Sequence, residues 1–213
     1  MEGHPFGARC PVCMGETRVA LSRQLSTEPS PTPLSSLNTE EKEKLRGPQG
    51  SQNIAVLLDN IRSAWNVGAI LRSADGFGLT HAYLCGITPT PDNEAVTKTS
   101  LGAEDSVPWS YHKNAVKLIK GLKVEGWKVF ALEEDARATE ISHASNGRDF
   151  ASATHPSHHE VLIVGNEVTG VDPELLDLCD MMFYIPMRGE KKSFNVAIAF
   201  GIAAYALNYQ SLK

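Results

Sequence analysis

The sequence predicts an α/β fold: a Rossmann-like parallel sheet with helices on both faces, preceded by a flexible N-terminal leader. Two patterns indicate it. After residue 53, short apolar runs typical of buried strands alternate with stretches of helical periodicity. Before residue 50, the chain is rich in proline, serine and charged residues. We therefore expect a leader over residues 1–50 and one folded domain over residues 51–213.

Length and composition exclude several classes of protein. The 213 residues are 42% hydrophobic and 21% charged, which excludes a wholly disordered chain. No apolar run reaches the roughly 18 residues that a membrane-spanning helix needs. Four cysteines are too few for a disulfide scaffold, so we expect a reducing compartment, the cytoplasm. The net charge of −5 argues against broad nucleic-acid binding but allows a local basic patch.

Five strands are predicted from apolar runs that end at polar residues. They cover residues 54–58, 81–85, 128–132, 161–164 and 181–185. Because the segments between them carry helical patterns, the strands should lie parallel in one sheet that is covered on both faces.

Four helices are predicted, over residues 66–75, 115–122, 172–179 and 195–207. The third begins with Asp172 as N-cap and Pro173 in its first turn. The fourth is apolar on every side from Val196 to Ala204, so it should be buried all round. A small domain has little room for such a helix, and we expect part of it to meet a second subunit. The alternative is a helix enclosed within one chain.

The first segment with candidate chemistry follows the first strand and runs from Asn60 to Arg72. Asn66 and Gly68 lie where the helix begins, and free backbone N–H groups at such a position attract anions. Arg72 follows nearly two turns later, and its apolar neighbours favour a partly buried position. The alternative is a solvated helix cation.

The second segment is Gly165-Asn166-Glu167, directly after the strand over residues 161–164. Glycine and asparagine suit a connecting turn, which is the alternative interpretation. Glu167 is not needed for a turn, and it therefore marks this loop as a candidate site.

The third segment lies between Pro186, where a strand stops, and the last helix. Ser193 and Asn195 both precede this helix, although capping needs only one of them. The same loop carries the sharpest basic cluster in an acidic domain, formed by Arg188, Lys191 and Lys192. Beside a candidate site these cations can meet phosphates, and the alternative is a solvated loop.

Taken in this order, the three segments resemble the three motifs of the SpoU (TrmH) family of RNA 2′-O-ribose methyltransferases, within the SPOUT superfamily. The resemblance covers about residues 53–207. It implies a C-terminal deep trefoil knot, an obligate homodimer and S-adenosylmethionine as cofactor. The chain departs from the family pattern at Phe194, where leucine is usual, and at Ala197, where a small polar residue is frequent.

The resemblance also implies the roles of individual residues. The catalytic set would be Arg72, Asn66, Glu167, Ser193 and Asn195. The cofactor would be bound by Leu132, Gly165, Ile185, Met187, Ser193 and Val196. RNA would be bound by Arg62 and the basic cluster of Arg188, Lys191 and Lys192.

The family account makes Arg72 the base that deprotonates the ribose hydroxyl. A guanidinium stays protonated, so we expect Arg72 to grip a phosphate and stabilise the developing alkoxide instead. Glu167 and Asn195 would then orient Arg72 or the hydroxyl. Transfer RNA is the first candidate substrate and ribosomal RNA the second. The competing class is an RNA-binding relative that has lost the reaction.

Methyl transfer from a sulfonium requires no metal. The pair Cys10 and Cys13 nevertheless forms half of a zinc ribbon, with His4 as a possible third ligand. The alternative is a reduced pair in a mobile leader. Cys85 ends a strand and Cys179 a helix, so both are predicted to be core residues.

Overall fold

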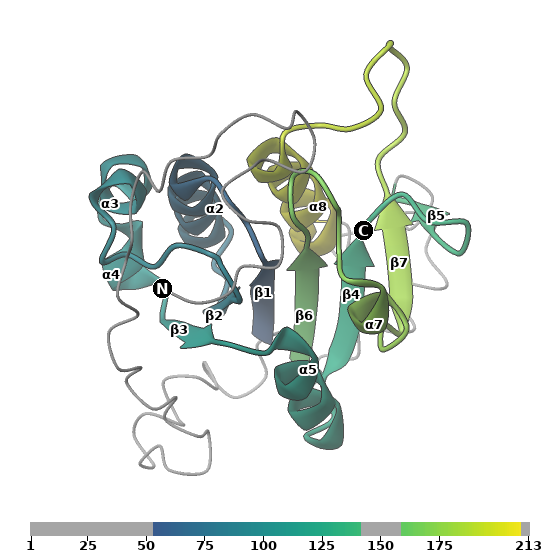
Figure 1. The fold of residues 1–213 in the computed structure, drawn as a ribbon, viewed down its shortest axis with the longest axis horizontal. Coiled ribbons are helices and arrows are strands. Elements are labelled where there is room, and N and C mark those ends of the chain that lie inside the picture. The colour runs from purple at the N-terminus through teal and green to yellow at the C-terminus, as the bar shows by residue number, and fades with distance from the viewer. Residues whose placement is uncertain (1–52, 142–158, 210–213) are drawn as a thin grey trace, which may run out of the picture. The chain divides into compact units, whose positions relative to one another are not determined.

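A computed structural model describes residues 53–141 and 159–209 of the chain (Figure 1). Seven strands form one sheet in the order β3-β2-β1-β6-β4-β7-β5, and every neighbouring pair is parallel. The strands are β1 (Asn53–Asp59), β2 (His81–Cys85), β3 (Trp109–His112), β4 (Lys128–Leu132), β5 (Thr139–Glu140), β6 (His159–Val164) and β7 (Met181–Tyr184). The predicted parallel sheet is therefore confirmed. The predicted leader, with His4, Cys10 and Cys13, lies outside the described residues.

Helices cover both faces of the sheet, as predicted. They are α2 (Ala64–Gly76), α3 (Glu94–Ser100), α4 (Ala103–Ser106), α5 (Ala115–Val124), α7 (Pro173–Leu176) and α8 (Val196–Tyr209). Alternate residues of a strand point to opposite faces. Leu58 of β1 accordingly packs in one buried cluster with α2 and α8, whereas Leu57 packs in another with α5 and α7.

Several elements were not predicted. Strand β3 has no apolar run, and its side chains are only partly buried because it lies at the edge of the sheet. Strand β5 has two residues, and the short helices α3 and α4 follow β2. The predicted helix over residues 172–179 ends at Leu176. Beyond it, the N–H groups of Leu178 and Cys179 each donate to the carbonyl three residues earlier, which tightens the chain into a turn.

Within a single chain α8 is buried on one side only, so the alternative of a helix enclosed within one chain is wrong. Phe200 and Ala203 are fully buried against the sheet. Ile198, Ile202 and Tyr205 are 56%, 37% and 61% exposed. These three residues recur at intervals of four and three, so they share one helix face. None of the described helices has the length and hydropathy required to cross a bilayer.

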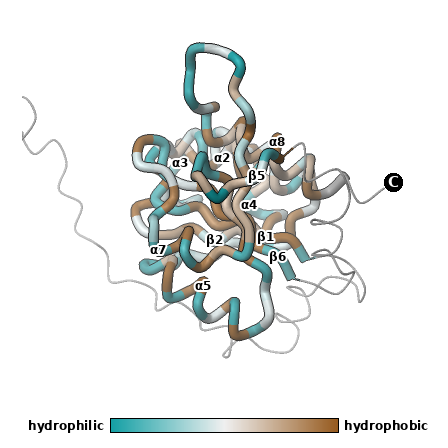
Figure 2. Tube along the Cα trace, turned by 90° about the vertical axis from the view of Figure 1, so that its right-hand side faces the viewer, coloured by the Kyte–Doolittle hydropathy of each residue, from teal (hydrophilic) through white to brown (hydrophobic). Residues whose placement is uncertain are grey.

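The loop between β7 and α8 projects beyond the ends of the strands (Figure 1). Figure 2 shows the same projection from the side, hydrophilic along most of its length. A polar segment of this kind gains nothing from packing on the core, so it is free to reach a ligand.

Glu160 is a buried acid in the centre of the sheet. It is 1% exposed and lies in register with Ile54 of β1 and Lys128 of β4. Among the described residues, neither of its carboxyl oxygens has a hydrogen-bond partner. Burial raises the pKa of Glu160 from its ordinary value of 4.5 to about 7.

Glu160→Gln should therefore remove a pH-dependent loss of stability. Because the pKa is higher in the folded protein, folding takes up a proton between pH 4.5 and about 7, and the free energy of unfolding falls as pH rises through this window. Above this window the variant should be more stable by up to about 3 kcal/mol, and below it the gain should vanish. Urea unfolding of wild type and variant near pH 4 and near pH 8 measures the difference in the free energy of unfolding on each side of this window. Glu190→Gln, at an exposed position, is the control. The same gain at both pH values would contradict this account.

Candidate active site

A pocket of about 500 Å³ lies at the carboxyl ends of β4, β6 and β7. These strands are neighbours in the sheet, and open α/β sheets bind ligands at this edge. The loop before α8 and the first turn of α8 complete the lining. The pocket contains every residue predicted to bind the cofactor, namely Leu132, Gly165, Ile185, Met187, Ser193 and Val196. The fold thus brings this set together, and its role as a binding site stays a prediction.

A chain of side-chain hydrogen bonds joins the three sequence segments beside this pocket. The Asn66 amide donates from Nδ2 to Glu167 Oε1 at 2.9 Å. Asn195 Nδ2 donates in turn to Asn66 Oδ1 at 3.0 Å, and Asn195 Oδ1 accepts from the backbone N–H of Ala197 at 2.9 Å. The start of α8 is thereby tied to the start of α2 and to the loop after β6.

The carboxylate of Glu167 is occupied by backbone donors as well. Its Oε2 accepts from the N–H of Arg62 at 2.9 Å, and its Oε1 accepts from the N–H of Ser63 at 3.1 Å. Partial burial raises the pKa of Glu167, but these hydrogen bonds and the one from Asn66 outweigh it and hold the pKa below its ordinary value. Glu167 is therefore an ionised clamp on the loop that opens α2, with little capacity left to take a proton.

The loop from Gly165 to Val171 is fixed from two sides. Asn166 Nδ2 donates to the carbonyl of Asn60 at 2.7 Å. The N–H of Val171 donates to Glu133 Oε2 at 2.8 Å. Gly170 has φ +72°, a conformation that favours glycine, and a side chain there would displace the Glu133 carboxylate that accepts from Val171. One wall of the pocket is thus held rigidly against another.

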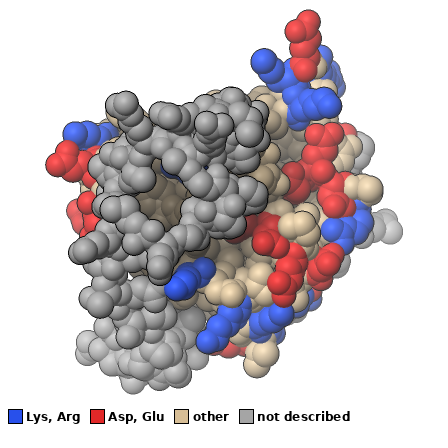
Figure 3. Space-filling view, viewed as in Figure 1, with Lys and Arg blue, Asp and Glu red and all other residues tan. Residues whose placement is uncertain are grey.

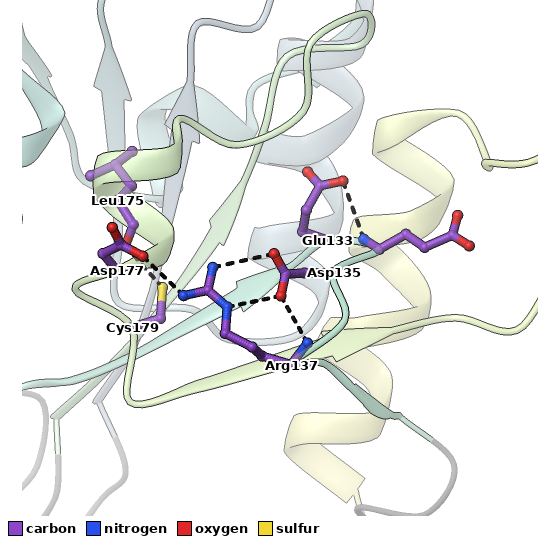
Figure 4. A network of polar contacts seen from close by, with 7 residues as sticks. Glu133, Asp135, Arg137, Leu175, Asp177 and Cys179 are labelled. Carbon is purple, nitrogen blue, oxygen red and sulfur yellow. Dashed lines mark hydrogen bonds and ion pairs between the residues drawn. The ribbon is translucent and has the colours of Figure 1, made fainter.

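The loop after β4 is held against α7 by charge (Figure 4). The Arg137 guanidinium binds Asp135 through Nε at 2.9 Å and Nη2 at 3.2 Å, and it reaches Asp177 through Nη1 at 2.9 Å. Hydrogen bonding to Arg137 lowers the pKa of Asp135. All three groups are accessible to solvent, so these ion pairs contribute little to the free energy of unfolding. Their effect is to fix the position of the loop relative to the end of α7.

Arg72 does not lie where the sequence predicted. It is exposed, and it makes no hydrogen bond or ion pair with any described residue. Because it follows Asn66 by six residues, it sits about 9 Å further along the helix axis. Glu167 and Asn195 contact Asn66 and not Arg72. The prediction of partial burial is therefore wrong within one chain. That Glu167 and Asn195 orient Arg72 or the hydroxyl stays a prediction.

The remaining predicted site residues are exposed. Ser193 lines the pocket, but Asn195 alone caps α8. Lys192 also lines the pocket, whereas Arg188 and Lys191 lie further out on the projecting loop. Figure 3 shows blue side chains gathered on this projection. Arg62 is exposed in the loop that Glu167 clamps.

Sequence reasoning missed two acidic residues of the pocket, Glu133 and Glu134. The signal was present, because both follow directly on a predicted strand at the ligand-binding edge. Within the described ranges no group of histidine, cysteine and carboxylate side chains could hold a metal. Cys85 is buried as predicted and Cys179 is half-buried, and burial raises the pKa of both thiols.

Comparison with known proteins adds a family to this geometry. The model of the "SpoU rRNA Methylase family" matches residues 53–205. The chain is 33% identical over 154 residues to the 23S rRNA (guanosine(2553)-2'-O)-methyltransferase RlmP of Bacillus subtilis, which covers 71% of this chain and 56% of that protein. It is 32% identical over 163 residues to the tRNA (guanosine(18)-2'-O)-methyltransferase of Thermus thermophilus, which covers 76% of this chain and 77% of that protein.

A solved structure agrees with these relatives. The AdoMet-bound rRNA methyltransferase of Sinorhizobium meliloti superposes with a TM-score of 0.66 at 27% identity, over 79% of this chain and 61% of that one. The chain spans 56% to 59% of the length of three of its curated relatives. Since the family model covers most of the folded residues, the protein belongs to the SpoU rRNA Methylase family.

Proposed function

We propose that this protein transfers a methyl group from S-adenosylmethionine to a ribose 2′-hydroxyl of RNA. The observation that carries the proposal is the pocket at three strand ends, with the hydrogen-bonded chain of Glu167, Asn66 and Asn195 beside it. Membership of the family and relatives with this activity support it.

The residues of the pocket fit the cofactor. Its volume of about 500 Å³ lies in the range of small-molecule sites. Apolar side chains such as Leu132 and Ile185 suit an adenine ring, and the carboxylates of Glu133 and Glu134 suit a cationic sulfonium. When bound, S-adenosylmethionine would supply a methyl group that the ribose oxygen takes, while the C–S electron pair stays on sulfur and the hydroxyl proton leaves to solvent.

The protein's own residues would position the reaction and stabilise its charge. The clamp of Glu167 fixes the start of α2, and Asn66 fixes Asn195 beside the pocket. The Arg72 guanidinium would grip a phosphate and stabilise the developing alkoxide. Ser193 completes the proposed catalytic set, because it lines the pocket.

We place Arg72 in the pocket of a second subunit. Trp65 and Arg72 are both exposed and lie seven residues apart, so they share one face of α2. Helix α2 contacts α8, whose Ile198 and Ile202 are also exposed. We propose that Trp65, Ile198 and Ile202 belong to one apolar surface of the kind that a homodimer covers. Light scattering should show a dimer, and Ile198→Glu with Ile202→Glu should make it a monomer.

The knot of the family is also part of the proposal. Strand β6 lies between β1 and β4, although it follows β4 in the chain, and α8 then returns to pack on α2. Such a return path is what a C-terminal knot requires.

We further propose that the protein acts in the cytoplasm, where RNA substrates and reduced cysteines are found.

Transfer RNA is the first candidate substrate, because the Thermus tRNA enzyme is matched over 77% of its length and the Bacillus rRNA enzyme over 56%. Ribosomal RNA is the second. Transfer of labelled methyl groups from S-adenosylmethionine to total RNA tests the activity, and mapping of 2′-O-methylation identifies the RNA. A purified protein that binds RNA but transfers no methyl group would support the non-catalytic alternative.

The RNA-binding surface can be tested through its salt dependence. Arg188, Lys191 and Lys192 lie on the projecting loop beside the pocket, where they can reach phosphates. Lys191→Ala combined with Lys192→Ala should weaken RNA binding and reduce the slope of log K against log salt by about 0.7 to 0.9 per lost phosphate contact. Lys98→Ala on α3, which removes an exposed cation elsewhere, is the control. An unchanged affinity and slope would mean that the loop is only solvated.

A further inference from the structure

Two large apolar side chains are exposed at the pocket itself. Val168 is 73% exposed and Phe194 is 40% exposed, and both line the pocket. Each is the direct chain neighbour of a residue in the hydrogen-bonded chain, Val168 of Glu167 and Phe194 of Asn195. Their backbone positions are therefore fixed by the same contacts that organise the candidate active site.

These two side chains do not serve the protein's own core. Neither belongs to the two buried clusters that pack on the faces of the sheet. They also differ in place from the exposed residues of α8, because Ile198, Ile202 and Tyr205 do not line the pocket. An apolar surface beside a polar site is a common mark of a ligand-binding surface.

The charges around this pair indicate what it binds. Lys192 lines the same pocket, and Arg188 and Lys191 follow on the same loop. A surface that combines cations with an exposed aromatic ring matches a single-stranded nucleic acid, whose phosphates are anionic and whose bases have apolar faces. A base inside a duplex has both faces covered by its neighbours and cannot use such a surface.

We propose, on the basis of the proposed function, that Phe194 and Val168 form an apolar lip on which the base of the methylated nucleotide stacks. The substrate is then an unpaired nucleotide in a loop or single strand. Its ribose enters the pocket, its phosphate lies among the cations of the projecting loop, and its base lies against the lip. Phe194 is thus a specificity-determining residue for the unpaired state of the RNA.

The test compares one RNA strand in two states. A labelled RNA of about 12 nucleotides with mixed sequence is titrated with protein, alone and annealed to its complement, and fluorescence anisotropy gives both affinities. Phe194→Ala should weaken binding of the single strand about tenfold or more and leave the duplex affinity nearly unchanged. Phe194→Trp should preserve binding, and Phe194→Leu should lie between. Val124→Ala, an exposed apolar residue at the far end of α5, should have no effect.

Further measurements separate the lip from other roles. Because no phosphate contact is removed, the salt slope of Phe194→Ala should equal that of the wild type, unlike the slope of the double lysine variant. Unchanged single-strand affinity would overturn the proposal. The proposal would also be overturned if Phe194→Ala lost S-adenosylhomocysteine binding in calorimetry but kept RNA binding. Dissociation of the dimer by Phe194→Ala would overturn it as well. If the wild type transfers no methyl group, the proposed function fails, whereas an active wild type with an unaffected Phe194→Ala variant overturns only the lip.

Discussion

Replacing Arg72 with alanine should lower the rate of methyl transfer about 10²- to 10³-fold, the loss typical when a group that stabilises developing charge is removed. The fold should stay intact, because Arg72 is exposed and contacts no described side chain through hydrogen bonds or ion pairs. Arg72→Lys should also be poor, since a point charge does not reproduce the planar guanidinium. Single-turnover rates with total RNA measure the effect, and Lys98→Ala, which removes an exposed cation from α3, is the control.

Mixing two inactive variants decides which subunit Arg72 serves. If it serves the partner, a heterodimer of an Arg72→Ala chain and a Glu167→Ala chain has one pocket with both residues intact. After subunit exchange, an equal mixture should then recover about a quarter of wild-type activity, because half of the dimers are mixed and each has one working pocket. If Arg72 serves its own chain, both pockets of the heterodimer are damaged and the mixture stays inactive. Recovery would also demonstrate the dimer in solution.

Breaking the hydrogen-bonded chain at Glu167 should have the second large effect. Glu167→Ala removes the acceptor for the N–H groups of Arg62 and Ser63 and for the Asn66 amide, so the start of α2 loses its fixed position. We expect the rate constant of transfer to fall about 10²-fold, the cost of misplacing a site by about 1 Å. The affinity for S-adenosylhomocysteine should change less, because Leu132, Ile185 and Val196 remain in place.

A double-mutant cycle distinguishes positioning from direct participation. If Glu167 acts through Asn66, the variant that carries Glu167→Ala and Asn66→Ala should be little slower than either single variant. Independent roles predict that the two losses multiply. Glu174→Ala, which removes an exposed glutamate on α7, should leave the rate unchanged. A wild-type pH profile whose acidic limb disappears in Glu167→Gln would show that Glu167 is the base, contrary to its occupied carboxylate.

The long strands and the helix starts could be predicted from the sequence because local residue patterns determine them. The apolar runs at residues 54–58 and 161–164 can be satisfied only in buried strands, and Asp172 with Pro173 marks a helix start. By contrast, β3 and β5 carry no such pattern. They are strands because β2 and β7 offer them hydrogen-bonding edges, which is a property of the assembled sheet.

The sequence alone determined which residue types gather at the ligand-binding edge: Leu132, Gly165 and Ile185 lie at the ends of strands that any parallel sheet brings together. Only the tertiary structure decided how the polar residues pair. Asn66 is 101 residues from Glu167 and 129 residues from Asn195 along the chain, so no local pattern could show that Glu167 binds Asn66 and leaves Arg72 in solvent. The same holds for α8, because its composition specifies burial but not whether its own chain or another covers Ile198 and Ile202.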